Sequence, residues 1–211
     1  MAMPEPNPPP LMHVVDDDES LRAALVRLLE AAGFEARGYA SAGDFLLHPV
    51  PDRPGCVLLD VRMPGPSGLD LQAALPAHKV KLPVIFMTGF ADVPTSVRAM
   101  KAGAVDFLEK PVQRQTLVEA IGRALQRDEQ QRRERNDIAG LRERFALLSP
   151  REQTVLEQVV AGKLNKQIAA ALEVSERTIK TLRAQCMDKL GAATSAELGT
   201  LVERLRRGSA D

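Results

Sequence analysis

The fold of this chain is decided by the stretch Leu11-Met12-His13-Val14-Val15-Asp16-Asp17-Asp18. A mostly apolar run ends at three consecutive carboxylates, and leucines then recur at helical spacing until Gly33 provides a stop signal. This pattern predicts a buried strand over residues 11–15 that ends at a polar edge and leads into an amphipathic helix.

The same alternation of strand and helix continues along residues 10–125. Further strands are predicted over 35–40, 56–59, 83–87 and 105–109, and helices over 41–47, 67–75, 95–102 and around 117–125. Helices that connect successive strands make those strands parallel and cover both faces of the sheet. We therefore predict an α/β fold for this part, a doubly wound, five-stranded parallel sheet with strand order 2-1-3-4-5.

The remainder of the chain shows no strand pattern. Residues 126–143 are Gln, Arg, Glu and Asp almost throughout, with Ile138 and Leu141 as the only large apolar residues. This composition predicts a solvated helical linker and leaves disorder as the alternative. Residues 144–211 contain four short helical segments, so we predict a small all-α four-helix domain there.

Charge and composition narrow the classes of function. Lys and Arg equal Asp and Glu at 28 each over the 211 residues, but they number 12 against 15 in residues 1–125 and 16 against 13 in residues 126–211. The second part is therefore the candidate for nucleic-acid binding. No apolar run approaches the ~20 residues of a membrane helix, and the Pro-rich start lacks a signal-peptide pattern. We expect a cytoplasmic protein that does not enter a membrane.

Neither a disulfide framework nor a zinc site is expected. Cys56 and Cys186 lie far apart in the chain, and the three histidines lack ligand spacing with them.

Charged and hydroxyl side chains stand where the predicted strands end. Asp16 and Asp17 follow the first strand and Asp60 the third by sequence, and the strand order makes these strands neighbours. Three close carboxylates repel one another unless a cation intervenes, and a hard ion such as Mg²⁺ suits them. Thr88 and Lys110 end the next two strands at the same edge. The set predicts a carboxylate nucleophile that attacks a phosphoryl group.

Not every carboxylate in this stretch needs such a role. Asp18 and Glu19 fit the first turn of a helix, where they would face the positive end of the helix dipole, and this reading is preferred for them.

Four motifs carry a resemblance to a known family. Val14-Val15-Asp16-Asp17-Asp18, Leu58-Leu59-Asp60-Val61-Arg62-Met63-Pro64, Met87-Thr88-Gly89 and Lys110-Pro111 resemble the receiver domain of two-component response regulators. The run from Ala91 to Phe107 resembles the FixJ subgroup of that family. The resemblance covers about residues 11–125.

The resemblance implies a role for each pocket residue. Asp60 would accept a phosphoryl group from a sensor histidine kinase, and Lys110 would contact the phosphate. Mg²⁺ (or Mn²⁺) would be bound directly by Asp17, Asp60 and the Arg62 backbone carbonyl, and by Asp16 through water. Thr88 and Phe107 would form the switch pair, and the Lys110-Pro111 peptide would be cis. Phe90 departs from the subgroup, which often has His there, and is expected to alter the phosphoryl lifetime or simply to pack as an aromatic residue.

A helix-turn-helix is predicted, with a short helix over residues 165–172, a turn at Val174-Ser175 and a longer helix over residues 176–190. Ile179, Leu182, Cys186 and Leu190 recur along one face of the second helix, which we expect to be buried. A major groove about 12 Å wide admits the other face, where Lys180, Thr181 and Ala184 would read bases. An ordinary solvated helix face is the alternative. The DNA-binding candidates are Asn165, Lys166, Arg177, Thr178, Lys180, Thr181, Arg183, Ala184 and Lys189.

The segments that surround this motif carry a second resemblance. Residues 148–156, Gly162, residues 165–169 and Lys189-Leu190-Gly191 resemble the LuxR-type DNA-binding domain. Leu182 departs from the His that is common in this family, and Leu164 from the common Ser or Pro. The two resemblances together imply a transcription regulator with promoter DNA and RNA polymerase as partners. They imply no enzyme, apart from help with its own phosphoryl transfer and dephosphorylation.

Phosphorylation is expected to shift a two-state equilibrium that produces a homodimer. The expected dimer surface comprises Val97, Arg98, Met100, Lys101 and Val105. The last helix, which contains Leu198, Leu201, Val202 and Leu205, is expected to pack the small domain and is a second candidate for pairing.

Two rival functions stay open at this point. Asp16-x-Asp18 after a strand faintly resembles haloacid-dehalogenase phosphatases, with Asp16 as nucleophile. The other rival is a receiver that acts through protein contacts alone, with the helical domain as a partner-binding module.

Overall fold

The computed structural model describes residues 8–89 and 92–207. Within them the chain divides into two compact units, of which the first ends at Gln131 and the second begins at Arg132. Each unit has a hydrophobic core of its own. Among the described helices, none combines the length and the apolar character needed to cross a membrane.

The described part of the first unit contains a five-stranded parallel sheet with order β2-β1-β3-β4-β5, which confirms the prediction. The central strands are buried along their whole length because helices cover both faces of the sheet. Val15 pairs with both Tyr39 and Leu59, so the carboxyl ends of the first three strands meet at one edge. The strands are β1 (Leu11–Val15), β2 (Glu35–Tyr39), β3 (Gly55–Asp60), β4 (Val84–Thr88) and β5 (Asp106–Glu109).

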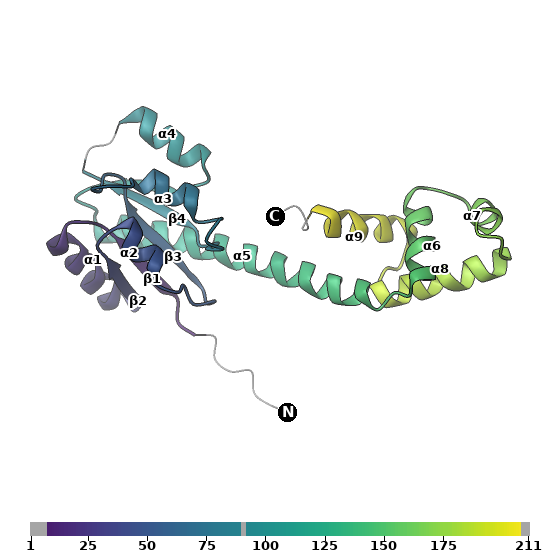
Figure 1. Cartoon of the computed structure of the whole chain (residues 1–211). Coiled ribbons are helices and arrows are strands. Elements are labelled where there is room, and N and C mark those ends of the chain that lie inside the picture. Colours follow the sequence, from purple (N-terminus) through teal and green to yellow (C-terminus); the bar gives the residue numbers. More distant parts are fainter. Residues whose placement is uncertain (1–7, 90–91, 208–211) are drawn as a thin grey trace, which may run out of the picture. The chain divides into compact units, whose positions relative to one another are not determined.

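Helices cover both faces of this sheet (Figure 1). One core joins the sheet to α1 and to the start of α5 through Leu25, Leu29, Leu117 and Ile121. The opposite core joins it to α2, α3 and α4, with Phe45, Leu71 and Ala99 among its members. The helices are α1 (Glu19–Ala31), α2 (Ala42–Leu47), α3 (Gly68–Ala74), α4 (Val93–Lys101) and α5 (Arg114–Ala146).

Side-chain caps determine where the shorter helices start. Asp18, Ser41, Ser67 and Asp92 each accept a hydrogen bond from the backbone N–H three residues later, which satisfies one unpaired donor of the first turn. The predicted start of α4 at residue 95 was wrong by two residues, because Asp92 caps the helix and Pro94 is tolerated within its first turn.

Helix α5 is continuous from Arg114 to Ala146, so residues 126–143 are helical throughout. Its two ends belong to different cores. The carboxylate of Asp128 is buried in the first unit and accepts a hydrogen bond from the Gly55 N–H at 3.2 Å. Leu141 is buried in the core of the second unit, with Phe145 packed against that core.

The second unit is helical, as predicted. Its core joins the end of α5 to α6 (Pro150–Val160), α7 (Asn165–Ala171), α8 (Glu176–Leu190) and α9 (Ser195–Arg207). Ser149 and Glu152 form a capping box at the start of α6. The buried Glu152 carboxylate also accepts a hydrogen bond from Lys189 Nζ at 2.8 Å, and these bonds lower the Glu152 pKa to about 2. The contact joins α6 to the end of α8.

Candidate functional site

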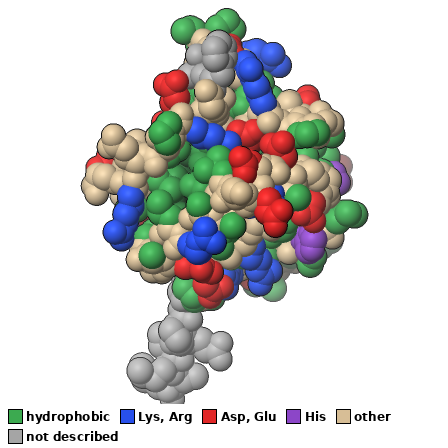
Figure 2. Space-filling model, turned by 90° about the vertical axis from the view of Figure 1, so that its left-hand side faces the viewer, with side chains coloured by type: hydrophobic (Ala, Val, Ile, Leu, Met, Phe, Trp, Pro, Cys, Tyr) green, Lys and Arg blue, Asp and Glu red, His purple; other side chains and the backbone are tan. Residues whose placement is uncertain are grey.

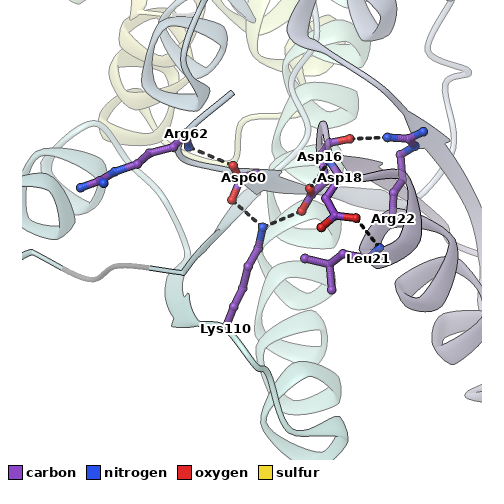
Figure 3. Close-up of polar contacts among 7 residues, drawn as sticks. All are labelled: Asp16, Asp18, Leu21, Arg22, Asp60, Arg62 and Lys110. Atoms are coloured by element: carbon purple, nitrogen blue, oxygen red, sulfur yellow. Dashed lines mark hydrogen bonds and ion pairs between the residues drawn. The ribbon is translucent and has the colours of Figure 1, made fainter. Parts of the chain in front are cut away.

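Two carboxylates and one ammonium group meet at the carboxyl edge of the sheet (Figure 3). Lys110 Nζ lies 2.6 Å from Asp60 Oδ1 and 2.7 Å from Asp16 Oδ2. Asp60 is 5% exposed and Asp16 is 1% exposed, so both charges depend on this contact and on nearby backbone donors. The predicted cluster of Asp16, Asp60 and Lys110 is therefore brought together by the fold.

The loops that follow β1 and β3 hold these carboxylates in place. Asp16 Oδ1 accepts a hydrogen bond from the Asp18 N–H at 3.0 Å, and Asp60 Oδ2 accepts one from the Arg62 N–H at 3.0 Å. Arg22 donates to the Asp16 backbone carbonyl at 2.6 Å. A Cβ on Gly68 would lie 2.1 Å from the Asp60 carbonyl oxygen, so only glycine allows the β3–α3 connection to return this closely.

Burial and the opposite charge of the partner shift the pKa of Asp60 in opposite directions, and the same holds for the pKa of Lys110. Burial raises the pKa of the Asp60 carboxyl, although the Lys110 ammonium opposes this rise. Burial alone would lower the pKa of Lys110, but its hydrogen bonds to Asp16 and Asp60 outweigh that effect and raise the Lys110 pKa. Lys110 is therefore a cation that stays charged beside a buried carboxylate near neutral pH.

The other predicted pocket residues lie around this cluster. Thr88 is buried at the end of β4, and its carbonyl accepts a hydrogen bond from the Lys110 N–H at 2.7 Å. Phe107 on β5 is half-buried, with its ring 6.1 Å from that of Phe86. The Lys110-Pro111 peptide is cis, as expected. Phe90 lies outside the described residues.

The acidic side chains of this pocket are ligands of the type that hard divalent cations prefer. Asp16 and Asp60 share one ammonium, and Asp17 adds a third carboxylate next to Asp16 in the chain, which leaves an excess of negative charge of the sort that Mg²⁺ balances. Asp17 is exposed, however, and Lys110 joins the other two carboxylates directly. Within residues 8–89 and 92–207, no three acidic, His or Cys side chains are gathered closely enough to hold a metal ion.

An apolar stripe lies on the outer side of α4. Val97 is 44% exposed and Met100 46%, with Arg98 and Lys101 exposed beside them and Val105 half-buried. The prediction missed Val93, which is 75% exposed and continues the stripe at the spacing of one helical turn. On the face of this unit that Figure 2 presents, hydrophobic side chains gather beside a group of Asp and Glu side chains.

The second unit exposes most of the predicted DNA-binding residues. Arg177, Lys180, Thr181 and Ala184 lie on the solvent side of α8, with Thr178 near its start and Lys166 on α7. Ile179, Cys186 and Leu190 are buried on the other side, and Leu182 is half-buried against the core. The predicted division of α8 into two faces is therefore present.

Three predicted DNA-binding residues, Asn165, Arg183 and Lys189, make side-chain contacts within the unit. Lys189 is bound to Glu152 and to the Leu147 carbonyl, and it lies in the last turn of α8. Arg183 is half-buried and donates to the Asn165 side chain at 3.0 Å. Local sequence does not reveal these contacts, because each partner comes from another part of the chain, 18 to 42 residues away.

Leu164 precedes α7 without a side-chain hydrogen bond to the first turn, since leucine has no acceptor. It is also exposed to solvent. Gln167 contributes at this helix start, because its Oε1 accepts a hydrogen bond from the Leu164 N–H at 2.9 Å.

Two family models match the chain over these same units. The response regulator receiver domain matches residues 12–122, and the luxR family of bacterial regulatory proteins matches residues 146–202. The chain belongs to the response regulators. It joins a receiver domain to a luxR-type DNA-binding domain, and proteins of this kind are two-component response regulators that control transcription.

Relatives match this response regulator over most of its length. Nodulation protein W of Bradyrhizobium diazoefficiens is 43% identical, over 92% of this chain and 86% of its own. Transcriptional regulatory protein FixJ of Azorhizobium caulinodans is 44% identical, over 93% of this chain and 92% of its own.

Solved structures agree with this assignment. The structure of the response regulator StyR superposes with a TM-score of 0.75 at 44% identity. The match covers 93% of this chain and 100% of StyR. Full-length FixJ from B. japonicum gives a TM-score of 0.56 at 40% identity, over 94% of this chain and 98% of its own.

Proposed function

We propose that Asp60 is the phosphoacceptor of this response regulator and that a sensor histidine kinase is the donor. The observation that carries the proposal is the 2.6 Å contact between Asp60 Oδ1 and Lys110 Nζ at the carboxyl edge of the sheet. In this assignment the receiver domain spans residues 10–125, the helical linker 126–143 and the DNA-binding domain 144–211.

Asp60 is suited to nucleophilic attack on phosphorus. One of its carboxylate oxygens forms an O–P bond with a phosphohistidine of the kinase while the P–N bond breaks. The electron pair of that bond returns to the imidazole, which leaves as a neutral ring when its other nitrogen carries a proton. Lys110 stabilises the charge on the phosphoryl oxygens. Later attack of water on the same phosphorus releases phosphate and restores the Asp60 carboxylate.

Mg²⁺, or Mn²⁺ in its place, would be held by Asp16, Asp17, Asp60 and the Arg62 backbone carbonyl. When bound, it supplies positive charge to the phosphoryl oxygens. The donor chemistry supports this assignment, because all of these ligands are hard oxygens.

Phosphorylation acts at a distance through Thr88 and Phe107, which lie on the adjoining strands β4 and β5. We assign the Thr88 hydroxyl to the phosphoryl group and the Phe107 ring to the coupled change at the outer surface of α4. The exposed apolar side chains of Val97 and Met100 then form the core of a homodimer.

The second domain binds promoter DNA through the solvent side of α8. Lys180, Thr181 and Ala184 are placed to meet base edges in the major groove, while Arg177 and Lys166 are suited to phosphates. We further propose that the protein contacts RNA polymerase and acts in the cytoplasm.

Substitution of the acceptor tests the function directly. Asp60→Asn keeps the size of the side chain and removes its nucleophilic charge, so acyl-phosphate labelling, recognised by its lability to base and hydroxylamine, by a phosphorylated histidine kinase domain should be lost. Asp16→Ala serves as the contrasting variant, since a phosphatase with Asp16 as its nucleophile would lose its turnover of phosphate esters there and keep it in Asp60→Asn. Labelling that survives in Asp60→Asn would remove Asp60 from the role.

A further inference from the structure

We propose that Arg183 is a positioning residue for α8, which holds the DNA-facing side of this helix in place from inside the domain and does not contact DNA. The inference rests on the proposed DNA-binding function and revises the role that the sequence predicts for this arginine. It assigns Arg183 to the specificity of binding instead of to phosphate contact.

A single guanidinium joins three helices at this point. Arg183 Nη1 donates to Asn165 Oδ1 at 3.0 Å, and Arg183 Nη2 donates to Ser195 Oγ. Asn165 is the first residue of α7, and Ser195 is the first residue of α9. The planar guanidinium offers donors in fixed directions, so it can hold two acceptors at one relative position.

The position of Arg183 along α8 agrees with this role. At about 100° per residue, Arg183 lies within about 60° of Ile179 and Cys186, both fully buried, and about 160° from the exposed Thr181. A side chain on this side of the helix points away from a groove that accepts the opposite side. Arg183 is indeed half-buried, whereas Arg177 on the same helix is exposed.

The contact between Arg183 and Asn165 links α7 to α8, and DNA binding depends on the angle between these two helices. In a helix-turn-helix, α7 supplies backbone contacts while α8 enters the groove, so their mutual angle determines whether both are made together. The connection between them is short, from Leu172 to Ser175, with Glu173 at a positive φ of 54°. Arg183 adds a side-chain link between α7 and α8 beyond this turn, and the Ser195 bond ties both to α9.

Two matched arginine variants on one helix test the assignment. Arg183→Met and Arg177→Met lose the same charge, and the full chain is activated with beryllium fluoride in every case. The probes are a duplex selected by the wild-type protein from a random library and a shuffled duplex of the same length. The dissociation constant for each is measured over a range of salt concentrations.

Arg183→Met and Arg177→Met should differ in which DNA affinities they weaken and in their salt dependence. Arg183→Met should bind the selected duplex at least 10-fold more weakly, with the shuffled duplex changed less than about 2-fold and the salt slope unchanged. Arg177→Met, as a phosphate contact, should weaken both duplexes and reduce the slope by about 0.9. A slope reduced by about 0.9 in Arg183→Met would overturn the proposal, as would an unchanged affinity for the selected duplex.

Arg183→Lys separates geometry from charge. A lysine at this position keeps the charge but cannot hold both acceptors in the same geometry, so the specificity defect should persist, whereas a phosphate contact would be restored. Circular dichroism and thermal unfolding report whether each variant folds.

If the arginine variants fail to fold, Asn165→Ala combined with Ser195→Ala removes the acceptors and leaves Arg183 in place. Loss of preference for the selected duplex in this double variant supports the proposal, and retained preference overturns it. A wild-type protein that shows no preference between the two duplexes would instead overturn the DNA-binding function itself.

Discussion

Lys110 Nζ lies 2.6 Å from Asp60 Oδ1, across the edge where β3 and β5 end. The same ammonium lies 2.7 Å from Asp16 Oδ2, so one cation serves two buried carboxylates. Because burial raises the Asp60 pKa and Lys110 opposes that rise, this contact favours the carboxylate form of Asp60, the proposed acceptor.

Replacement of this cation should slow phosphorylation. In Lys110→Met, the phosphoryl oxygens lose a positive partner at the moment of transfer, and we expect labelling by acetyl phosphate to slow about 10²-fold. Stopped-flow or quenched labelling of Asp60 measures the rate. Lys81→Met removes an exposed lysine that belongs to neither the pocket nor the dimer surface and should leave the rate unchanged. Equal rates in Lys110→Met and wild type would contradict the role of Lys110.

His13 should make the stability of the receiver domain depend on pH. Burial, with the nearby charges of Arg37 and Arg53, lowers the His13 pKa from 6.5 to about 4. Between these values the unfolded chain binds a proton that the folded chain excludes, so stability is complete above about pH 6.5 and falls toward pH 4. The difference amounts to about 3 kcal/mol.

Nuclear magnetic resonance of the His13 ring and unfolding from pH 7 to pH 4 measure this effect. His13→Gln should flatten the dependence over that range. The exposed His48 supplies the control, because His48→Gln should leave the dependence in place. A His13 ring that titrates near 6.5 in the folded protein would contradict the expectation.

Asp128 should stabilise the receiver domain although it lies beyond the predicted domain end. Its side chain is 0% exposed and accepts a hydrogen bond from the Gly55 N–H at the start of β3. Asp128→Ala leaves that buried donor without this acceptor, which should cost about 1–3 kcal/mol of unfolding free energy. Gln130→Ala changes a nearby exposed residue of α5 and should stay within about 0.5 kcal/mol of wild type in urea unfolding. Equal losses in both variants would show that the buried contact between Asp128 and Gly55 contributes nothing of its own to stability.

The apolar stripe of α4 should be needed for dimer formation. Met100→Glu places a charge in the centre of the proposed symmetric contact, where it would face its own copy, and should weaken dimerisation at least 10-fold. Sedimentation of the beryllium fluoride-treated protein measures the dissociation constant. Leu47→Glu is the matched control, since Leu47 is 84% exposed on the same domain but lies on α2. A dimer unaffected by Met100→Glu would place the interface elsewhere.

Local sequence was a sound guide to the pocket at the sheet edge. Asp16, Asp60 and Lys110 each follow an apolar run, and parallel strands necessarily end at the same edge. Their convergence therefore follows from topology alone, without knowledge of packing. The charged linker was also predicted as helical, but its periodicity did not show that Asp128 is buried, because the Gly55 partner lies 73 residues away in the chain.

For α8, the local sequence pattern predicted the buried face of the helix but not the contacts of its individual cations. The pattern of apolar residues predicted which side of α8 is buried, yet it placed Arg183 and Lys189 among the DNA contacts because long cations usually face solvent. In the fold they meet Asn165 and Glu152, which lie on α7 and α6. Such pairs arise only when helices distant in sequence pack together.

The amino-acid sequence by itself determined the order of strands and helices, the two-domain organisation and the residues at the strand ends, because these depend on short-range periodicity and on the geometry of parallel sheets. Only the tertiary structure decided which charged side chains are free to meet a partner molecule. That outcome depends on whether a second helix or strand supplies a hydrogen-bonding group at the right distance, and no local pattern contains this information.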